Sequence, residues 1–169
     1  NGFSPGLGFP KVQAPPRELN WDMWLGPAPY AEYFPERCHK SYRYFLDYSG
    51  GVFADFWCHI ADIAWWSVHP KGLKSVTARG GKTDGVADAP KWLDAAFEFE
   101  NVKLFWTTEP PNLPGAAERN IGAYFEGDKG TLICDYNTRS ITINGETVED
   151  IPSVEKTIPR SPGHQQNFV

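Results

Sequence analysis

Glycine and proline are spread so densely through this chain that they leave room for only one long helix. The 169 residues include 16 Gly and 15 Pro, and proline interrupts helices and central strands. The longest apolar-rich segment that contains neither residue runs from Val52 to Val68. We predict a helix from Gly51 to Ser67, ended by His69-Pro70, because the residue before a proline is biased away from the helical conformation.

The sequence after this helix alternates between short apolar–polar runs and turn residues. Asn144-Gly145 is the clearest turn, since this dipeptide suits a type I′ hairpin. We predict strands at 74–79, 93–100, 102–108, 121–126, 130–134, 140–143 and 146–148. One helix followed by consecutive hairpins predicts the α+β class, as an antiparallel sheet with helix cover on one face.

The N-terminal region differs in composition from the rest. Residues 1–36 are rich in Pro, Gly and Trp, and Trp21–Gly26 suits a single helical turn. We predict an ordered arm there, because disordered segments are poor in aromatic residues. Residues 37–169 then form the α+β domain. The length fits one core and leaves no room for an additional dinucleotide-binding (Rossmann) domain of about 150 residues.

The charge balance and the hydropathy pattern exclude two classes of partner. The net charge is −5, whereas nucleic-acid binding produces a basic excess. No apolar run approaches the roughly 18 residues of a membrane span. We therefore expect neither nucleic acid nor membrane as a partner.

The three cysteines stand far apart, at Cys38, Cys58 and Cys134. An odd, dispersed set argues against a disulfide framework and favours reduced thiols. With no secretory signal at the start, we expect a cytoplasmic protein, although an export signal upstream of Asn1 would not be visible. The Cys-His pairs at 38–39 and 58–59 lack the spacing of zinc ligands, so we predict no metal site.

The predicted helix carries the most informative polar residues. Asp55, His59 and Asp62 follow an i, i+4, i+7 spacing and share one stripe. Apolar residues occupy most of the remaining circumference, which predicts a largely buried helix and makes a polar stripe costly unless it has partners or faces a cleft. Either Asp55 and His59 satisfy each other as structure, or His59 transfers a proton in a cleft while Asp55 sets its tautomer.

Other residues leave further alternatives open. Aromatic residues form 15% of the chain, which fits either a core of large side chains or a site where rings stack on a sugar. Lys40 and Arg43 fit either a solvated edge or the wall of a polar pocket. The sequence contains no Gly-x-Gly-x-x-Gly fingerprint, phosphate loop or Gly-x-Ser-x-Gly elbow.

Two segments resemble a known family. Trp21-Asp22-Met23-Trp24-Leu25-Gly26-Pro27-Ala28-Pro29, which is similar to a large bacterial subgroup, and Gly50-Gly51-x3-Asp55-x3-His59-x2-Asp62 resemble the C-terminal, substrate-binding domain of the Gfo/Idh/MocA oxidoreductases. The resemblance implies a dihydrodipicolinate-reductase-like domain with an open, mainly antiparallel β-sheet. In the family this domain is paired with an N-terminal Rossmann domain. It also implies hydride transfer between NAD or NADP and a sugar, polyol or related compound.

The resemblance assigns roles to individual residues. His59 is similar to the family's proton-transferring histidine, and Asp55 to the carboxylate one turn before it. We predict Lys40, Arg43 and Asp62 as substrate-binding residues. The family's Glu-Lys-Pro motif, which belongs to the cofactor domain, is missing here.

The resemblance also predicts partners and limits. We expect a sugar-like small-molecule substrate, a missing Rossmann domain and a homo-oligomer formed through the sheet face. Asn1 would lie in the crossing between the two domains, and His164–Val169 would begin a late helix of the family. The isolated chain would bind no cofactor and be inactive. The alternatives are a non-enzymatic carbohydrate-binding or dimerisation module, and a metal-assisted hydrolase or lyase that uses the three polar residues of the helix.

Overall fold

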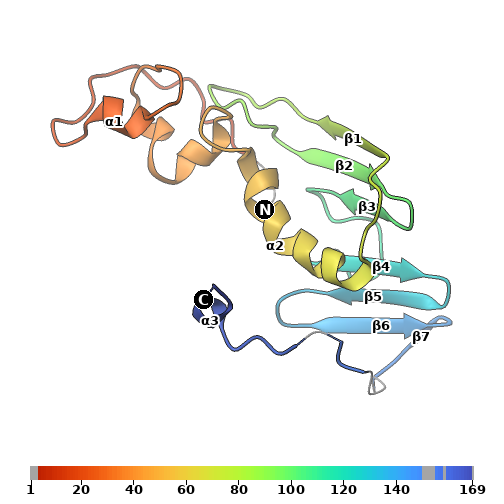
Figure 1. The fold of residues 1–169 in the computed structure, drawn as a ribbon. Helices are drawn as coiled ribbons and strands as arrows, with labels where there is room; N and C mark the ends of the chain where they lie inside the picture. Colours follow the sequence, from red (N-terminus) through yellow and green to blue (C-terminus); the bar gives the residue numbers. More distant parts are fainter. Residues whose placement is uncertain (1–3, 150–154, 158, 169) are drawn as a thin grey trace.

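A computed structural model describes residues 4–149, 155–157 and 159–168. One long helix, α2 (Gly51–Val68), lies beside a stack of antiparallel strands, and the N-terminal region projects away from them (Figure 1). Near the C-terminus, α3 (His164–Phe168) forms a short helix. The expectations that concern Asn1 and Val169 fall outside the described residues.

The long helix begins and ends close to its predicted limits. It starts at Gly51 and extends one residue beyond Ser67. His69 then adopts a left-handed conformation with φ 42°, and its backbone N–H donates to the carbonyl of Trp65 at 3.0 Å. This bond satisfies a terminal carbonyl, and Pro70 follows. The stop is therefore encoded locally.

The strands confirm the α+β class, but they form two sheets rather than one. β1 (Ser75–Gly80), β2 (Leu93–Glu98) and β3 (Lys103–Trp106) form the first sheet, and β4 (Ala123–Gly127), β5 (Gly130–Cys134), β6 (Arg139–Ile143) and β7 (Glu146–Thr147) form the second. All paired neighbours are antiparallel. The irregular segment 107–122 separates the sheets, and its three prolines cannot donate to a ladder.

The hairpin predicted at Asn144-Gly145 is confirmed. Asn144 has φ 51° and Gly145 has φ 85°, the two positive values that a type I′ turn requires. The turn joins β6 to β7, with Ile143 opposite Glu146.

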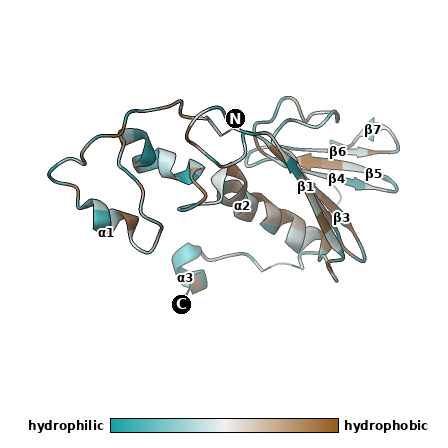
Figure 2. Cartoon of the chain, turned by 90° about the horizontal axis from the view of Figure 1, so that it is seen from above, coloured by the Kyte–Doolittle hydropathy of each residue, from teal (hydrophilic) through white to brown (hydrophobic). Residues whose placement is uncertain are grey.

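One face of α2 packs on the first sheet through aromatic rings. Trp57 stacks on Phe97 of β2 with ring centroids 4.7 Å apart, and Phe53 meets Trp106 of β3 edge to face at 5.4 Å. The helix is hydrophobic along most of its length (Figure 2).

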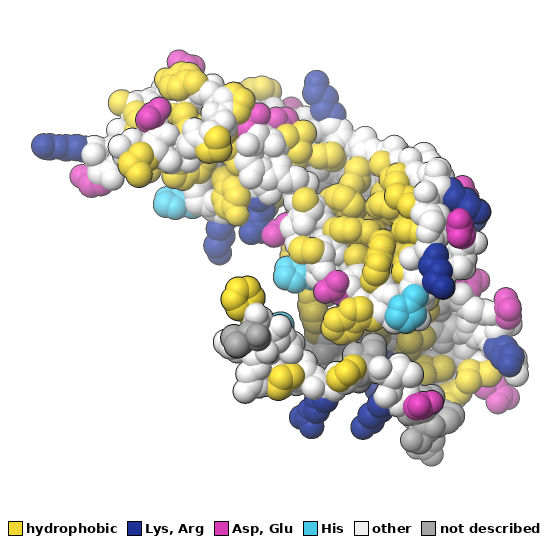
Figure 3. All heavy atoms as spheres, viewed as in Figure 1, with side chains coloured by type: hydrophobic (Ala, Val, Ile, Leu, Met, Phe, Trp, Pro, Cys, Tyr) yellow, Lys and Arg dark blue, Asp and Glu magenta, His cyan; other side chains and the backbone are white. Residues whose placement is uncertain are grey.

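The opposite face of α2 is open to solvent, so the prediction of a largely buried helix is wrong. Trp66 is 59% exposed, and Phe56 and Ile63 are exposed as well. Hydrophobic side chains gather on the surface over α2 and the adjoining strands (Figure 3). Only Gly51 and Val52 are buried along the helix, because the sheet covers it from one side.

The N-terminal region has a small core of its own. α1 (Trp21–Leu25) begins after Asn20, whose side chain accepts a hydrogen bond from Met23 N, and ends at Gly26, which has φ 57°. This single turn was predicted. Two short 3-10 helices, η1 (Pro35–Arg37) and η2 (His39–Tyr44), follow and were not predicted. The buried members of this core are Trp21, Leu25, Tyr33 and Cys38.

Within the described segments, no helix combines the length and the apolar character needed to cross a membrane.

Candidate functional site

An ion pair joins the N-terminal half of α2 to η2. Arg43 Nη1 lies 3.2 Å from Asp55 Oδ2, and the two side chains are 33% and 36% exposed. η2 packs against α2, which places the guanidinium opposite the carboxylate. The structure therefore brings together one residue predicted to bind substrate and one predicted to act in catalysis.

One N–H group of the Arg43 guanidinium makes no hydrogen bond to the described residues. Its Nε is buried and has no hydrogen-bond partner among the described residues. Buried donors are normally satisfied by protein, water or ligand. The described residues therefore supply no partner for this N–H.

His59 and Asp62 lie further along the same helix and are exposed. The imidazole of His59 packs near the ring of Phe56, with centroids 6.2 Å apart. In the described part of the chain no hydrogen bond joins Asp55 to His59, and the charged partner of Asp55 is Arg43. The open side of α2 therefore presents His59 to solvent, one turn from an anchored carboxylate.

Lys40 is exposed on η2 and makes no ion pair with any described residue. The structure places it on the same short helix as Arg43, without an ion pair to Asp55. Across the described ranges, no group of three His, Cys, Asp or Glu side chains is arranged to hold a metal ion.

The cysteines are unpaired, and their surroundings differ. Burial raises the pKa of the Cys38 thiol, and burial is also the main cause that raises the pKa of Cys134. A raised pKa keeps both groups as poorly nucleophilic thiols. Cys58 is exposed on α2, where its thiol lies 3.5 Å from the carbonyl oxygen of Asp55.

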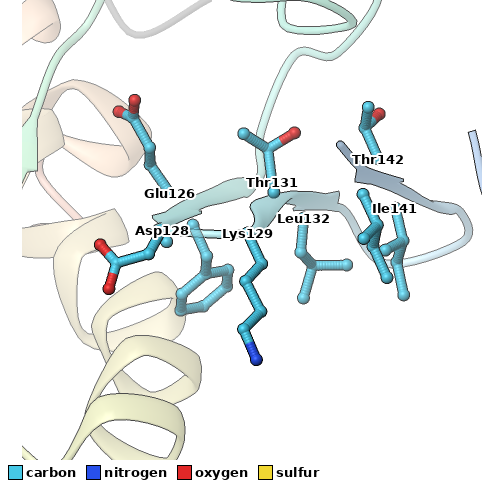
Figure 4. Close-up of a pocket in the computed structure, with 11 residues that line it drawn as sticks. Glu126, Asp128, Lys129, Thr131, Leu132, Ile141 and Thr142 are labelled. Atoms are coloured by element: carbon cyan, nitrogen blue, oxygen red, sulfur yellow. The ribbon is translucent and has the colours of Figure 1, made fainter. Parts of the chain in front are cut away.

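A hollow of about 490 Å³ lies over the second sheet, away from the predicted residues. Leu132 and Ile141 point to one side of the strands, together with Lys129, whereas Glu126 and Thr131 point to the other (Figure 4). This alternation follows the register of β4, β5 and β6. One side of the second sheet therefore carries half-buried apolar side chains, with Lys129 at its edge.

A second hollow, of about 480 Å³, lies between α1 and η2. Trp24, Tyr42, Asp47 and Tyr48 line it, and we call it the arm hollow. Trp24 lies in the motif that resembles the family, but the sequence did not predict a hollow formed by these four residues. The i, i+3 spacing of Trp21 and Trp24 within one turn was the available signal, because it stacks the two indoles on the same side of α1.

Comparison with known proteins identifies one family. A family model described as the oxidoreductase family, C-terminal alpha/beta domain, matches residues 6–160. No curated protein matches the chain.

Proposed function

The chain belongs to the Gfo/Idh/MocA oxidoreductase family through its C-terminal α/β domain, and from this premise we propose that it is the substrate-binding and catalytic half of an NAD(P)-dependent oxidoreductase. Its substrate in this proposal is a sugar, a polyol or a related compound. One observation carries the proposal: the exposed His59 lies one helical turn from the Arg43–Asp55 ion pair.

Each residue of this site has a role in the proposal. The imidazole of His59 takes the proton from a substrate hydroxyl on oxidation and returns it on reduction. Asp55, held by Arg43, supplies a fixed negative charge near that imidazole. The guanidinium of Arg43, whose side chain is 33% exposed, donates to a substrate oxygen. Lys40 and Asp62 bind other polar groups of the substrate.

A dinucleotide does not fit the residues of this chain alone. The long helix α2 follows η2 rather than a strand, and its start lacks the Gly-x-Gly-x-x-Gly fingerprint of a cofactor site. We therefore assign the hydride chemistry to a Rossmann domain and only substrate binding and proton transfer to the residues described here. The exposed apolar side chains Phe56, Ile63 and Trp66 support the docking of such a domain over α2.

Mutation of the proposed base tests this function. In the protein joined to its cofactor domain, His59→Ala should lower kcat by about 10²–10⁴, the usual contribution of a general acid–base group. His164→Ala is the matched control, since His164 lies on α3 and should leave kcat unchanged. An unaltered kcat in His59→Ala removes the residue from the chemistry. Turnover by the isolated chain with NAD(P) would contradict the assignment of the cofactor to another domain.

Self-association through the second sheet is also part of the proposal, and a non-enzymatic dimerisation module is its alternative. The support is the apolar side of that sheet, where Ile143 is exposed and Leu132 and Ile141 are half-buried. Sedimentation velocity at several protein concentrations should show a dimer that Ile143→Lys weakens. A monomer at all concentrations would refute association through this face.

We also propose that the protein is cytoplasmic, because unpaired thiols persist in reducing compartments.

A further inference from the structure

The arm hollow is a preformed cavity that the proposed chemistry does not use. Its walls are Trp24 and Leu25 of α1, the segment 27–29, Tyr42 of η2, and Asp47 with Tyr48. Asp55, His59 and Asp62 do not line it. Its volume of about 480 Å³ lies within the roughly 300–1,000 Å³ of small-molecule sites.

The indole wall of the arm hollow is fixed from behind. Trp24 stacks on Trp21 with centroids 4.7 Å apart and planes 13° from parallel. Trp21 is buried, and its indole N–H donates to the carbonyl of Ala31 at 2.8 Å. Trp24 is therefore held in its orientation by contacts within the protein.

The tyrosine wall is fixed as well. Arg37 donates from Nη1 to the hydroxyl of Tyr48 at 3.2 Å, and the same guanidinium lies over the rings of Phe34 and Phe45 at 4.5 and 4.6 Å. Tyr48 in turn meets Trp24 edge to face at 5.1 Å. Walls ordered in this way spare a ligand the entropy cost of immobilising them.

The charge of the arm hollow selects the kind of ligand. Asp47 is the charged residue of its lining, and it is exposed with no hydrogen-bond or ion-pair partner among the described side chains. Its carboxylate repels anions and accepts hydrogen bonds from hydroxyl groups. The electron-rich faces of aromatic rings attract the C–H groups of an apolar or sugar surface.

A quaternary ammonium group also suits aromatic rings beside a carboxylate, but the ring arrangement disfavours it here. One face of Trp24 is covered by Trp21, and Tyr48 meets Trp24 edge to face. The exposed aromatic ring of the lining is that of Tyr42. One open ring can stack on one side of a sugar but cannot surround a cation. We infer that the arm hollow binds a neutral sugar ring at a site separate from Asp55 and His59.

The inference is tested by titrating the full chain with methyl β-D-glucoside and with cellobiose. Binding is measured by calorimetry and by ligand-observed NMR. Tyr42→Ala removes a 42% exposed ring and should weaken binding about tenfold. Asp47→Asn should weaken it as well. These two exposed positions avoid the core, unlike Trp24. The matched controls are Tyr30→Ala, at an 80% exposed ring outside the hollow, and Asp22→Asn on α1, and neither should change binding.

Three results would overturn the inference: no binding of either sugar at millimolar concentration, binding that Tyr42→Ala and Asp47→Asn leave unchanged, or tighter binding of choline or of a proline-rich peptide to the same residues. His59→Ala should leave sugar binding at the arm hollow intact. Loss of turnover without loss of this binding, or the reverse, therefore separates the fate of this site from that of the proposed enzyme activity.

Discussion

Replacing Trp57 by alanine should destabilise the protein far more than the same replacement at Trp66 on the same helix. Trp57 contacts three other aromatic rings: Phe97 at 4.7 Å, Phe53 at 5.3 Å and Trp106 at 6.0 Å. Trp66 is 59% exposed. Comparing the two substitutions therefore shows which face of α2 is packed against the sheet.

The magnitude follows from the area and the contacts of Trp57. A tryptophan buries roughly 150–250 Å²; taking about 150 Å² for this half-buried ring, at ~25 cal/mol per Å², gives about 4 kcal/mol. This is an upper value, because unfolded chains already bury some apolar area. Alanine also favours the helix by about 0.5 kcal/mol. We expect the free energy of unfolding to fall by about 3 kcal/mol, within the range of aromatic-to-alanine changes in cores.

Urea unfolding followed by far-UV circular dichroism measures this loss. In thermal unfolding, the midpoint temperature should fall by about 6–12 °C, because each kcal/mol shifts it by roughly 2–4 °C for a domain of this size. Trp66→Ala should cost less than about 1 kcal/mol, as exposed substitutions usually do. Equal losses at the two positions, or a larger loss at Trp66, would refute the orientation of α2 and with it the exposure of His59.

Two further predictions concern charges. The first is a double-mutant cycle with Arg43→Met and Asp55→Asn, in which the coupling energy obtained from unfolding should be about 0.5–1.5 kcal/mol. This value is expected because an ion pair at 3.2 Å whose side chains are about one-third exposed lies between surface and buried pairs. Zero coupling would show that Arg43 does not hold the carboxylate. Asp135 accepts hydrogen bonds from the backbone N–H groups of Asn137 and Thr138, which lower its pKa. Its contribution to stability is therefore fully present above the ordinary carboxyl pKa and is lost as pH falls through the lower pKa of the folded state. Asp135→Asn should make the free energy of unfolding fall less steeply as the pH is lowered. An unchanged pH dependence would contradict this.

Most of the local structure follows from local sequence, as α2 and the β6–β7 hairpin show. A run without Pro or Gly bounded by Gly51 and Pro70 determines where the helix begins and ends, and Asn144-Gly145 determines a turn with two positive φ values. These choices depend on backbone sterics within a few residues. For the same reason η2 was missed, since Lys40 to Tyr44 contains no strong start or stop residue.

The candidate site was only partly predictable. The i, i+4 spacing placed Asp55 and His59 on one stripe, and this holds for any helix. The partner of Asp55 was not readable, because Arg43 reaches it only through the packing of η2 on α2. The arm hollow likewise depends on contacts between α1 and Tyr48 that no local pattern reports.

The sequence by itself determined the class of the fold, the limits of its long helix and the stripe that carries Asp55, His59 and Asp62. Only the tertiary structure decided which way that stripe faces. α2 has apolar side chains around most of its circumference, so its own pattern does not choose a buried side. The choice comes from Phe97 and Trp106, which lie on strands distant in the sequence and pack against one side of the helix, leaving His59 on the open side.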